Sequence, residues 1–470
     1  MRTKIIATVG PASSSRDMLA RLAEAGVAIF RLNFSHGDVA FFRRIVDDIR
    51  SIEQERGKPL TILQDLPGPK IRIGVLPDNQ LTVNKGDKLI LGPEAQKGDA
   101  LPLLPFDNQQ LLKDMSPEDL LVLADGGLRF RVRERLADGR VIIEARGTGI
   151  ITSRKGLALP GKTVALPAIT DKDRKNLAIG LELGVDAVAV SFVQNAADIR
   201  QAKALLKEAG RNLPVVAKLE RRNAVDNLAS ILAETDMVMV ARGDLGVECP
   251  LPELPALQKR IIRACNLASK PVIVATQMLL SMVSNPIPTR AETTDVANAV
   301  LDGADCVMMS EETAMGNYPV ETVAYMRQIT GEAENYLEET RRLIEPEARS
   351  GPPEFLAYAA CLLAEKTGAR ALAAHSMSGS AARLLAACRP AQPIHALTTD
   401  MSVVRALNFT WGVQPHCVEE NPDLSHLQRV QRFIDSTPSF PVGEDVVITA
   451  GEPSPGQPRP GTNLVKIYRK

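Results

Sequence analysis

Charged side chains close several short apolar runs of this chain, and their types suit a metal ion and an anionic ligand. Lys218 and Glu220 end the run 214–220 (PVVAKLE), and Asp244 follows the run 237–240. Mg²⁺ (or Mn²⁺) is usually bound through one or two carboxylates together with oxygens of the substrate. Glu220 and Asp244 are therefore candidate metal ligands, with surface salt bridges as the alternative.

Two cations could complete a site for a transferring phosphoryl group. Lys218 lies two residues before Glu220, so both side chains point to the same face of a strand. A lysine within an apolar run is costly unless it is functional or belongs to a structural ion pair. Arg31 closes the run 27–33 and adds a second cation for such an anion clamp.

Few histidines are available for proton transfer at such a site, because only His36 precedes residue 375. Thr276, which closes the run 271–277, is a candidate proton relay or carboxylate ligand, and a purely structural role is the alternative. The stretch 310–312 (Ser-Glu-Glu) is a weaker candidate for part of a proton route.

These side chains need strands that end side by side, and eight apolar runs meet this need. Helical patterns alternate with the runs, which predicts parallel pairing with right-handed crossovers. Eight units favour a closed (β/α)8 barrel over an open doubly wound sheet, and barrel chemistry lies where the strands end. The predicted strands are 3–9, 27–33, 61–66, 186–192, 214–220, 237–243, 271–277 and 306–311, and the predicted helices are 17–25, 39–55, 172–183, 197–209, 222–233, 254–268 and 289–302.

The alternation breaks between Asp65 and Asp171, where short alternating strands and turn signals predict a small inserted β-barrel domain. Hinges at 67–69 and 159–161 would let this domain act as a lid over the barrel mouth. The predicted turns are 77–79, 85–87, 125–127 and 138–139, and the short predicted helices are 108–112 and 117–121.

A Pro- and charge-rich stretch at 345–353 separates a further α/β domain. Its predicted helices are 354–367 and 381–388, and its predicted strands are 371–375, 393–397, 413–418, 445–449 and 464–468. The predicted domains are therefore the barrel at 1–66 and 165–342, the β lid at 67–164 and the C-terminal α/β domain at 343–470.

The composition limits the kinds of binding partner and the cellular compartment that we expect. Lys+Arg and Asp+Glu both number 56 among 470 residues, so net charge gives no support for broad binding to nucleic acid or membrane. Six scattered cysteines without CxxC pairs predict buried free thiols in a reducing compartment. With no signal peptide or membrane span in the sequence, we expect a cytoplasmic protein.

Six segments make the chain similar to the pyruvate kinase family over essentially its whole length. The segments are 3–13 (TKIIATVGPAS), 31–37 (RLNFSHG), 155–161 (KGLALPG), 236–250 (DMVMVARGDLGVECP), 271–278 (PVIVATQM) and 288–305 (PTRAETTDVANAVLDGAD). The resemblance is to the bacterial type without an N-terminal extension. It implies a glycolytic enzyme, commonly a homotetramer, that transfers the phosphoryl group of phosphoenolpyruvate to ADP and releases pyruvate and ATP.

The resemblance also implies a role for each candidate residue. Mg²⁺ would be held by Glu220 and Asp244. The implied substrate contacts are Arg31 and Lys218 to the phosphoryl group and Gly243, Asp244 and Thr276 to the carboxylate, with Lys218, Arg31 and Thr276 as catalytic residues. The implied nucleotide contacts are Pro11, Asn33, His36, Arg72 and Lys155.

The hinge differs from the family pattern at a position linked to K⁺. Many relatives use K⁺ at positions occupied here by Asn33, Ser35, Asp65 and Leu66, and carry Asp-Thr-Lys-Gly-Pro-Glu. This chain has Asp-Leu-Pro-Gly-Pro-Lys, and within the family Lys at the last position, here Lys70, accompanies independence from K⁺. An ammonium group can replace a monovalent cation, so we expect activity without K⁺. A lysine that is merely solvated is the alternative.

A Ser- and Gly-rich turn in the C-terminal domain resembles the family's effector site. Relatives bind a sugar phosphate or a nucleotide such as AMP through Thr-x-Ser-Gly-x-Ser, at a helix N-terminus that favours phosphate. Ser376 and Ser378 match the first two hydroxyl positions and Gly379 matches the Gly, whereas Ala381 replaces the last hydroxyl. Ser380 completes the candidate effector turn. A plain helix cap is the alternative. Glu311 also departs from the family, which often has Gly there, and no mechanistic reason follows from the sequence.

Two other functions stay open at this level. A Mg²⁺-dependent lyase acting on pyruvate enolate, such as an aldolase, would also place Glu, Asp and a cation around a keto acid. The lid and the pair Arg72 and Lys155 favour the kinase, because a lyase needs no clamp for nucleotide phosphates. A catalytically silent metabolite sensor is the third hypothesis, although every expected catalytic residue is present.

Overall fold

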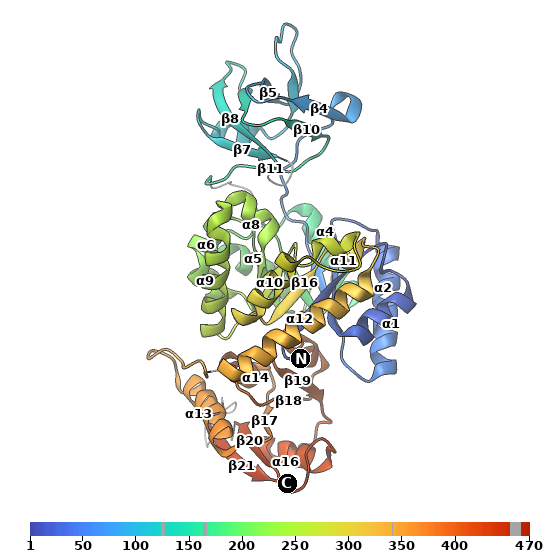
Figure 1. Ribbon diagram of the computed structural model, residues 1–470, viewed down its shortest axis with the longest axis vertical. Coiled ribbons are helices and arrows are strands. Elements are labelled where there is room, and N and C mark those ends of the chain that lie inside the picture. The colour runs from blue at the N-terminus through green and yellow to red at the C-terminus, as the bar shows by residue number, and fades with distance from the viewer. Residues whose placement is uncertain (124–126, 163–166, 341, 452–461) are drawn as a thin grey trace.

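The computed structural model describes residues 1–123, 127–162, 167–340, 342–451 and 462–470. Three bodies follow one another along the long axis of the molecule, with the barrel between the lid and the C-terminal domain (Figure 1). Within the part of the chain that the structure describes, no helix combines the length and apolarity needed to span a membrane.

The central body is a closed barrel of eight parallel strands, as the sequence predicts. Its order is β1-β16-β15-β14-β13-β12-β3-β2, and its strands are unbroken apolar runs because both faces are covered. The bounds are β1 (Lys4–Val9), β2 (Val27–Asn33), β3 (Thr61–Asp65), β12 (Ala187–Val190), β13 (Val215–Leu219), β14 (Met237–Ala241), β15 (Val272–Ala275) and β16 (Cys306–Met309).

Six of the predicted strands were one or two residues too long at their carboxyl ends, and in two of them extra residues belong to helices. Residues 242–243 belong to helix α8 (Arg242–Glu248), and Glu311 opens helix α11 (Glu311–Ala314). The ladder between β14 and β15 stops at Ala241 and Ala275, and the polar residues that follow turn into the barrel mouth. The side chains expected to do chemistry therefore lie just beyond the strands.

Helices cover the outside of the barrel, and capping boxes fix the starts of three of them, at Thr170, Asn195 and Thr289. The single helix predicted at 222–233 is wrong, since a bend at Asn227 divides it. The bounds are α1 (Arg16–Ala25), α2 (Val39–Arg56), α4 (Asp171–Leu183), α5 (Ala196–Glu208), α6 (Arg222–Asp226), α7 (Leu228–Glu234), α9 (Leu254–Leu267), α10 (Arg290–Leu301) and α12 (Pro319–Thr340), with short 3-10 turns η1 (Pro77–Asn79) in the lid, η3 (Leu251–Glu253) and η4 (Leu280–Val283).

The lid is inserted after β3 and has its own core, in a curled sheet of order β11-β7-β8-β9-β5-β6 and a pair β10-β4. The helix predicted at 117–121 is wrong, because the chain turns at Glu118 (φ +72°) and enters β7. Part of the predicted turn 125–127 and the predicted boundary at 164 lie outside the described residues. The bounds are β4 (Gln80–Val83), β5 (Lys88–Gly92), β6 (Leu103–Pro105), α3 (Gln109–Asp114), β7 (Leu120–Leu123), β8 (Leu128–Arg135), β9 (Val141–Ala145), β10 (Gly149–Thr152) and β11 (Leu157–Ala158).

The C-terminal domain is a five-stranded sheet of order β19-β18-β17-β20-β21 flanked by helices, two of which, α15 and α16, the sequence analysis missed. Five cysteines of the chain are buried free thiols as expected, whereas Cys417 is exposed. The bounds are α13 (Pro352–Thr367), β17 (Ala371–His375), α14 (Ser380–Ala387), β18 (Ile394–Thr398), α15 (Met401–Leu407), β19 (Val413–Cys417), α16 (His426–Ser436), β20 (Asp445–Ala450) and β21 (Leu464–Arg469).

Candidate active site

The strand ends bring together a compact cluster of cations and carboxylates around Lys218. Its Nζ lies 2.9 Å from Glu220 Oε1 and 3.1 Å from Asp65 Oδ1. The same Nζ donates to Ser191 Oγ at 2.6 Å. Arg31 Nε donates to the other oxygen of Asp65 at 2.7 Å. Four strands thus supply one buried network, with two cations sharing Asp65.

Burial and charge act against each other in this network. Burial disfavours the charged ammonium of Lys218, but Asp65 and Glu220 outweigh it and raise the pKa of Lys218. Burial likewise disfavours the carboxylate of Asp65, but Lys218 and Arg31 outweigh it and lower the pKa of Asp65. The geometry therefore keeps two fixed positive charges at the mouth of the barrel.

Glu220 and Asp244 are the two carboxylates that could hold a divalent metal. They follow the neighbouring strands β13 and β14, and Asp244 lies in the first turn of α8. Burial raises the pKa of Glu220, so a bound divalent cation would stabilise its ionised form. No cluster of three or more His, Cys, Asp or Glu suited to a metal occurs in the described ranges. Two hard carboxylates fit Mg²⁺, which takes its remaining ligands from substrate and water.

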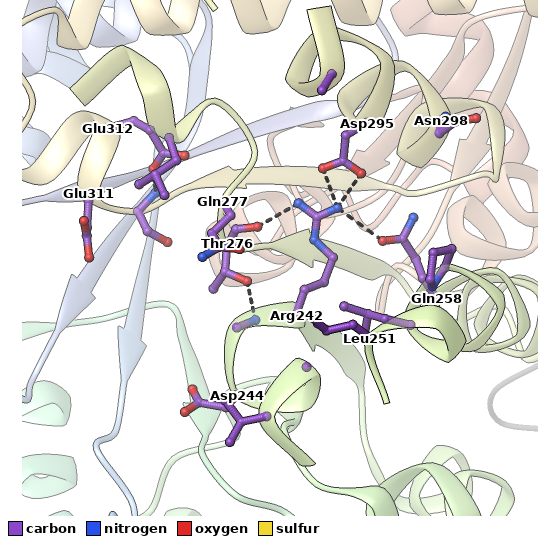
Figure 2. Close-up of a pocket in the computed structure, with 18 of the residues that line it drawn as sticks. Arg242, Asp244, Leu251, Gln258, Thr276, Gln277, Asp295, Asn298, Glu311 and Glu312 are labelled. Carbon is purple, nitrogen blue, oxygen red and sulfur yellow. Dashed lines mark hydrogen bonds and ion pairs between the residues drawn. The ribbon is translucent and has the colours of Figure 1, made fainter. Parts of the chain in front are cut away.

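Hydrogen bonds of Thr276 and Arg242 connect the ends of β14 and β15 (Figure 2). Thr276 has φ +70°, and its Oγ1 accepts from the Gly243 backbone N at 2.7 Å and donates to the Ala275 carbonyl at 2.6 Å. Arg242 donates to the Thr276 carbonyl and to both oxygens of Asp295, each at 2.7 Å. Thr276 therefore orients the start of α8, and its hydroxyl proton is already used.

A cavity of about 940 Å³ lies between the barrel mouth and the lid, and its lining, as the described residues define it, includes Asp244 and Thr276 but not Lys218, Arg31, Asp65 or Glu220. The barrel contributes Asp244, Thr276 and Glu311 to its lining, and the lid side contributes Lys70 and Arg129. Figure 2 shows Asp244, Thr276 and Glu311 arranged around this space. The volume is ample for a small phosphorylated substrate together with part of a nucleotide.

Lys70 reaches the mouth from the first hinge, and its Nζ lies 3.8 Å from Asp244 Oδ1. Asp65, part of the region expected to resemble the K⁺ site, forms ion pairs with Arg31 and Lys218. Asn33 Oδ1 accepts from the Ser35 backbone N at 3.1 Å.

The residues predicted to bind nucleotide are less closely gathered. His36 and Arg72 are exposed, and Arg72 Nη1 donates to the Arg154 carbonyl at 2.9 Å. The lining of the 940 Å³ cavity, as the described residues define it, includes none of the five predicted nucleotide contacts Pro11, Asn33, His36, Arg72 and Lys155.

The predicted effector turn lies between β17 and α14, far along the chain from the mouth. Ser376 Oγ accepts from the Ala381 backbone N at 3.3 Å, and the hydroxyls of Ser378 and Ser380 are 3.2 Å apart. Ser378 and Ser380 line a cavity of about 910 Å³ with Arg383 and Lys270. Gly379 (φ +78°) precedes α14 and has no side chain to cap it.

Sequence reasoning missed three contributors to the site. Ser191 binds Lys218, Arg242 binds the backbone of Thr276, and the Phe192 backbone N donates to Glu220 Oε2 at 2.6 Å. Ser191 and Phe192 close the fourth predicted strand run, so the same search for polar groups at strand ends could have found Ser191.

Comparison with known proteins gives a consistent result along the chain. The model described as "Pyruvate kinase, barrel domain" matches residues 1–323, and that described as "Pyruvate kinase, alpha/beta domain" matches residues 354–468. A pyruvate kinase of Agrobacterium vitis is 45% identical, covering 96% of this chain and 94% of the relative. Pyruvate kinases of Methylorubrum extorquens and Thermococcus litoralis are 39% and 36% identical, covering 99% and 100% of this chain and 97% and 98% of those relatives.

Proposed function

The chain belongs to the pyruvate kinase family of phosphotransferases, and we propose that it transfers the phosphoryl group of phosphoenolpyruvate to ADP, giving pyruvate and ATP. One observation carries the proposal at the level of the site. Lys218 and Arg31 stand side by side at the barrel mouth, both held by Asp65, where they can grip a phosphoryl group.

Two groups of residues contribute to the reaction, namely these two cations and the residues at the ends of the neighbouring strands. An oxygen of the ADP β-phosphate attacks phosphorus, and the bond from phosphorus to the enol oxygen breaks. Lys218 and Arg31 stabilise the charge on the moving phosphoryl group, and Lys218 then stabilises the enolate oxygen. The substrate carboxylate would lie near Gly243, Asp244 and Thr276. Protonation of the enolate carbon completes pyruvate.

A divalent cation, generally Mg²⁺ in this family, would neutralise charge on the substrate oxygens. Glu220 and Asp244 would hold it, because their carboxylates end neighbouring strands beside Lys218. The hydrogen bond that Thr276 gives to the Ala275 carbonyl favours a positioning role over proton delivery.

The test is pyruvate release from phosphoenolpyruvate and ADP with Mg²⁺, with tetramethylammonium as the only monovalent cation. Turnover that needs both substrates and yields ATP supports the kinase. Pyruvate formed from a larger keto acid without ADP would instead support the lyase, and no turnover with any effector, either without or with added KCl, would support the sensor.

We further propose that the enzyme works without K⁺, because Lys70 supplies a monovalent cation at the mouth. Its support is the ion pair of Lys70 with Asp244 at 3.8 Å. Wild-type turnover should change less than about 2-fold on adding KCl, whereas Lys70→Glu should require KCl. A strict K⁺ requirement of the wild type would contradict this proposal and leave the kinase assignment intact.

Regulation is proposed at the turn Ser376, Ser378, Gly379 and Ser380, with a sugar phosphate or AMP as effector. The support is the cavity of about 910 Å³ beside Ser378, Ser380 and Arg383. Ser378→Asp should abolish activation while unstimulated turnover stays constant, and persistent activation would contradict the site.

A homotetramer in the cytoplasm, as the resemblance and the composition imply, is testable by sedimentation and by localisation of a tagged chain.

A further inference from the structure

Arg221 follows the expected metal ligand Glu220, and its environment is unusual for an arginine. The residue is only 5% exposed, and its Nε and Nη1 atoms have no hydrogen-bond partner among the described residues. A buried guanidinium with so few hydrogen bonds is costly to keep. The carboxylates of Glu248 and Glu220 attract it, so one explanation is a simple counter-charge.

A second explanation comes from the aromatic ring beneath the guanidinium. The Cζ of Arg221 lies 5.2 Å from the ring centroid of Phe192, within the range of a cation–π contact. Phe192 has φ +56°, which is unfavourable for a bulky residue and needs support from its surroundings. In this conformation its backbone N donates to Glu220 Oε2 at 2.6 Å.

The same turn also touches the lid hinge. A Cβ added to Gly68 would lie 3.1 Å from Phe192 Cδ2 and 2.9 Å from Ser191 Cβ. A cavity of about 40 Å³ at this junction is lined by Phe192, Glu220 and Arg221 of the barrel and by Lys70 of the lid side. The ring of Phe192 is thus fixed between the hinge and Arg221.

We propose that Arg221 is a positioning residue for the metal site. By holding the ring of Phe192, it keeps the turn in the conformation that directs the Phe192 N–H at Glu220. Lys218 holds the other oxygen of Glu220 at 2.9 Å, so the carboxylate is oriented before a metal binds. The proposal rests on the proposed function, because it takes Glu220 as a metal ligand.

Mn²⁺ binding to the free enzyme, measured by electron paramagnetic resonance, distinguishes the two explanations, because they predict opposite changes in the Kd for Mn²⁺. Arg221→Met removes the cation but keeps an apolar side chain. Loss of positioning should raise the Kd for Mn²⁺ about 10-fold or more, as is typical for groups that orient a metal ligand. Loss of a mere counter-charge should lower that Kd, because a repelling cation has gone. Unchanged or tighter binding would overturn the proposal.

Two further variants make the test specific. Arg222→Met removes the neighbouring arginine, which pairs with Asp226 and Glu253, and should leave the Kd for Mn²⁺ unchanged. Phe192→Leu should weaken binding as Arg221→Met does, and the double variant should be no weaker than either single one. If Arg221→Met did not fold, wild-type Mn²⁺ binding by Phe192→Leu would still overturn the proposal.

The metal assignment has its own control, so that the two failures can be told apart. Glu220→Gln should abolish Mn²⁺ binding if Glu220 is a ligand. Normal binding by Glu220→Gln would refute the ligand assignment itself, and with it the premise for Arg221. Weak binding by Glu220→Gln together with normal binding by Arg221→Met would refute only the role of Arg221.

Discussion

Asp65 is the residue on which both cations of the proposed site depend. Its two oxygens bind Arg31 at 2.7 Å and Lys218 at 3.1 Å, and its charge helps to raise the pKa of Lys218. Asp65→Asn should therefore lower the pKa of Lys218 and move the alkaline limb of the pH profile of kcat/KM to lower pH. We expect kcat/KM to fall at least 10-fold, or about 1.4 kcal/mol of transition-state stabilisation.

The control for Asp65→Asn is Asp226→Asn, which removes one of the two carboxylate partners of Arg222 on the barrel surface. It should leave the pH profile unchanged. An alkaline limb that stays in place in Asp65→Asn would show that Asp65 does not set the protonation of Lys218.

The location of single functional residues could be predicted only where the direction of the strands determines it. Lys218, Glu220, Asp244 and Arg31 were expected at one mouth, because parallel strands of a barrel end on the same side. Their pairing was not predictable, since it depends on strand register and side-chain rotamers. Asp65 was assigned to the region where relatives use a monovalent cation, and its ion pairs with Arg31 and Lys218 were not predicted.

At the scale of elements, the first lid hinge packs directly on the site. Gly68 has φ +64°, and a Cβ there would lie 2.9 Å from Ser191, whose hydroxyl binds Lys218. Gly57 has φ +60° with nothing within 4 Å of its added Cβ, so it is a matched control. Alanine at either position should cost stability of about 1 kcal/mol through backbone strain.

Only Gly68→Ala should also reduce kcat, by 10-fold or more, because it displaces Ser191. Steady-state kinetics and thermal melting of the two variants measure both effects. Equal kcat values in Gly68→Ala and Gly57→Ala would mean that the hinge contact does not position Lys218.

Two buried histidines of the C-terminal sheet, His375 and His395, should make the folded enzyme less stable at acidic pH. Burial, with His426 and Arg429 nearby, lowers the pKa of His375 to about 4, and burial beside His416 lowers that of His395 to about 4. Between pH 6.5 and 4 the unfolded chain binds protons that the folded domain excludes. The free energy of unfolding should therefore fall as the pH falls through this window, by at most about 1.4 kcal/mol per pH unit for each histidine.

His375→Phe tests this acid sensitivity, because both ring nitrogens of His375 have no partner among the described residues. The variant should match the wild type in urea unfolding at pH 7.5 and lose less stability at pH 5. Parallel stability curves over the whole pH range would rule out His375 as a source of the effect.

Element types were predicted well where long periodic segments determine them, and poorly at polar boundaries. The barrel strands were found, but Arg242 and Gly243 of α8 were read as the end of a strand because they directly follow the apolar run of β14. The helices α15 and α16 were missed although both carry local signals. Asp400 caps α15, and α16 begins at a capping box at Ser425 and buries Val430 and Ile434 on one face.

For the whole molecule, Phe409 is one of the side chains that join the C-terminal domain to the barrel core. Phe409 is fully buried among Ile6, Ile29, Met239 and other inward-facing residues of the barrel strands. Phe409→Ala should destabilise the protein by about 3–5 kcal/mol through the cavity it leaves. Calorimetry should then show the C-terminal domain and the barrel melting in separate transitions.

Phe355→Ala is the control for Phe409→Ala, because Phe355 lies on α13 and is 39% exposed. It should shift the melting temperature little. One cooperative transition at the wild-type temperature in Phe409→Ala would contradict this role of Phe409.

The three-part organisation was predictable because the strand–helix rhythm breaks once in the barrel and ends at a Pro-rich stretch. How the parts meet was not, since Phe409 and the ion pair of Arg405 with Glu53 join residues hundreds of positions apart. Such contacts have no local sequence signal.

The most direct test of the central claim compares the wild type with Lys218→Met under phosphoenolpyruvate, ADP and Mg²⁺, with pyruvate and ATP measured together. The wild type should form one ATP for each pyruvate, and Lys218→Met should lose kcat about 100-fold or more, while the exposed Lys207→Met should not. Pyruvate formed without ATP, or wild-type turnover by a folded Lys218→Met, would contradict phosphoryl transfer at this cluster.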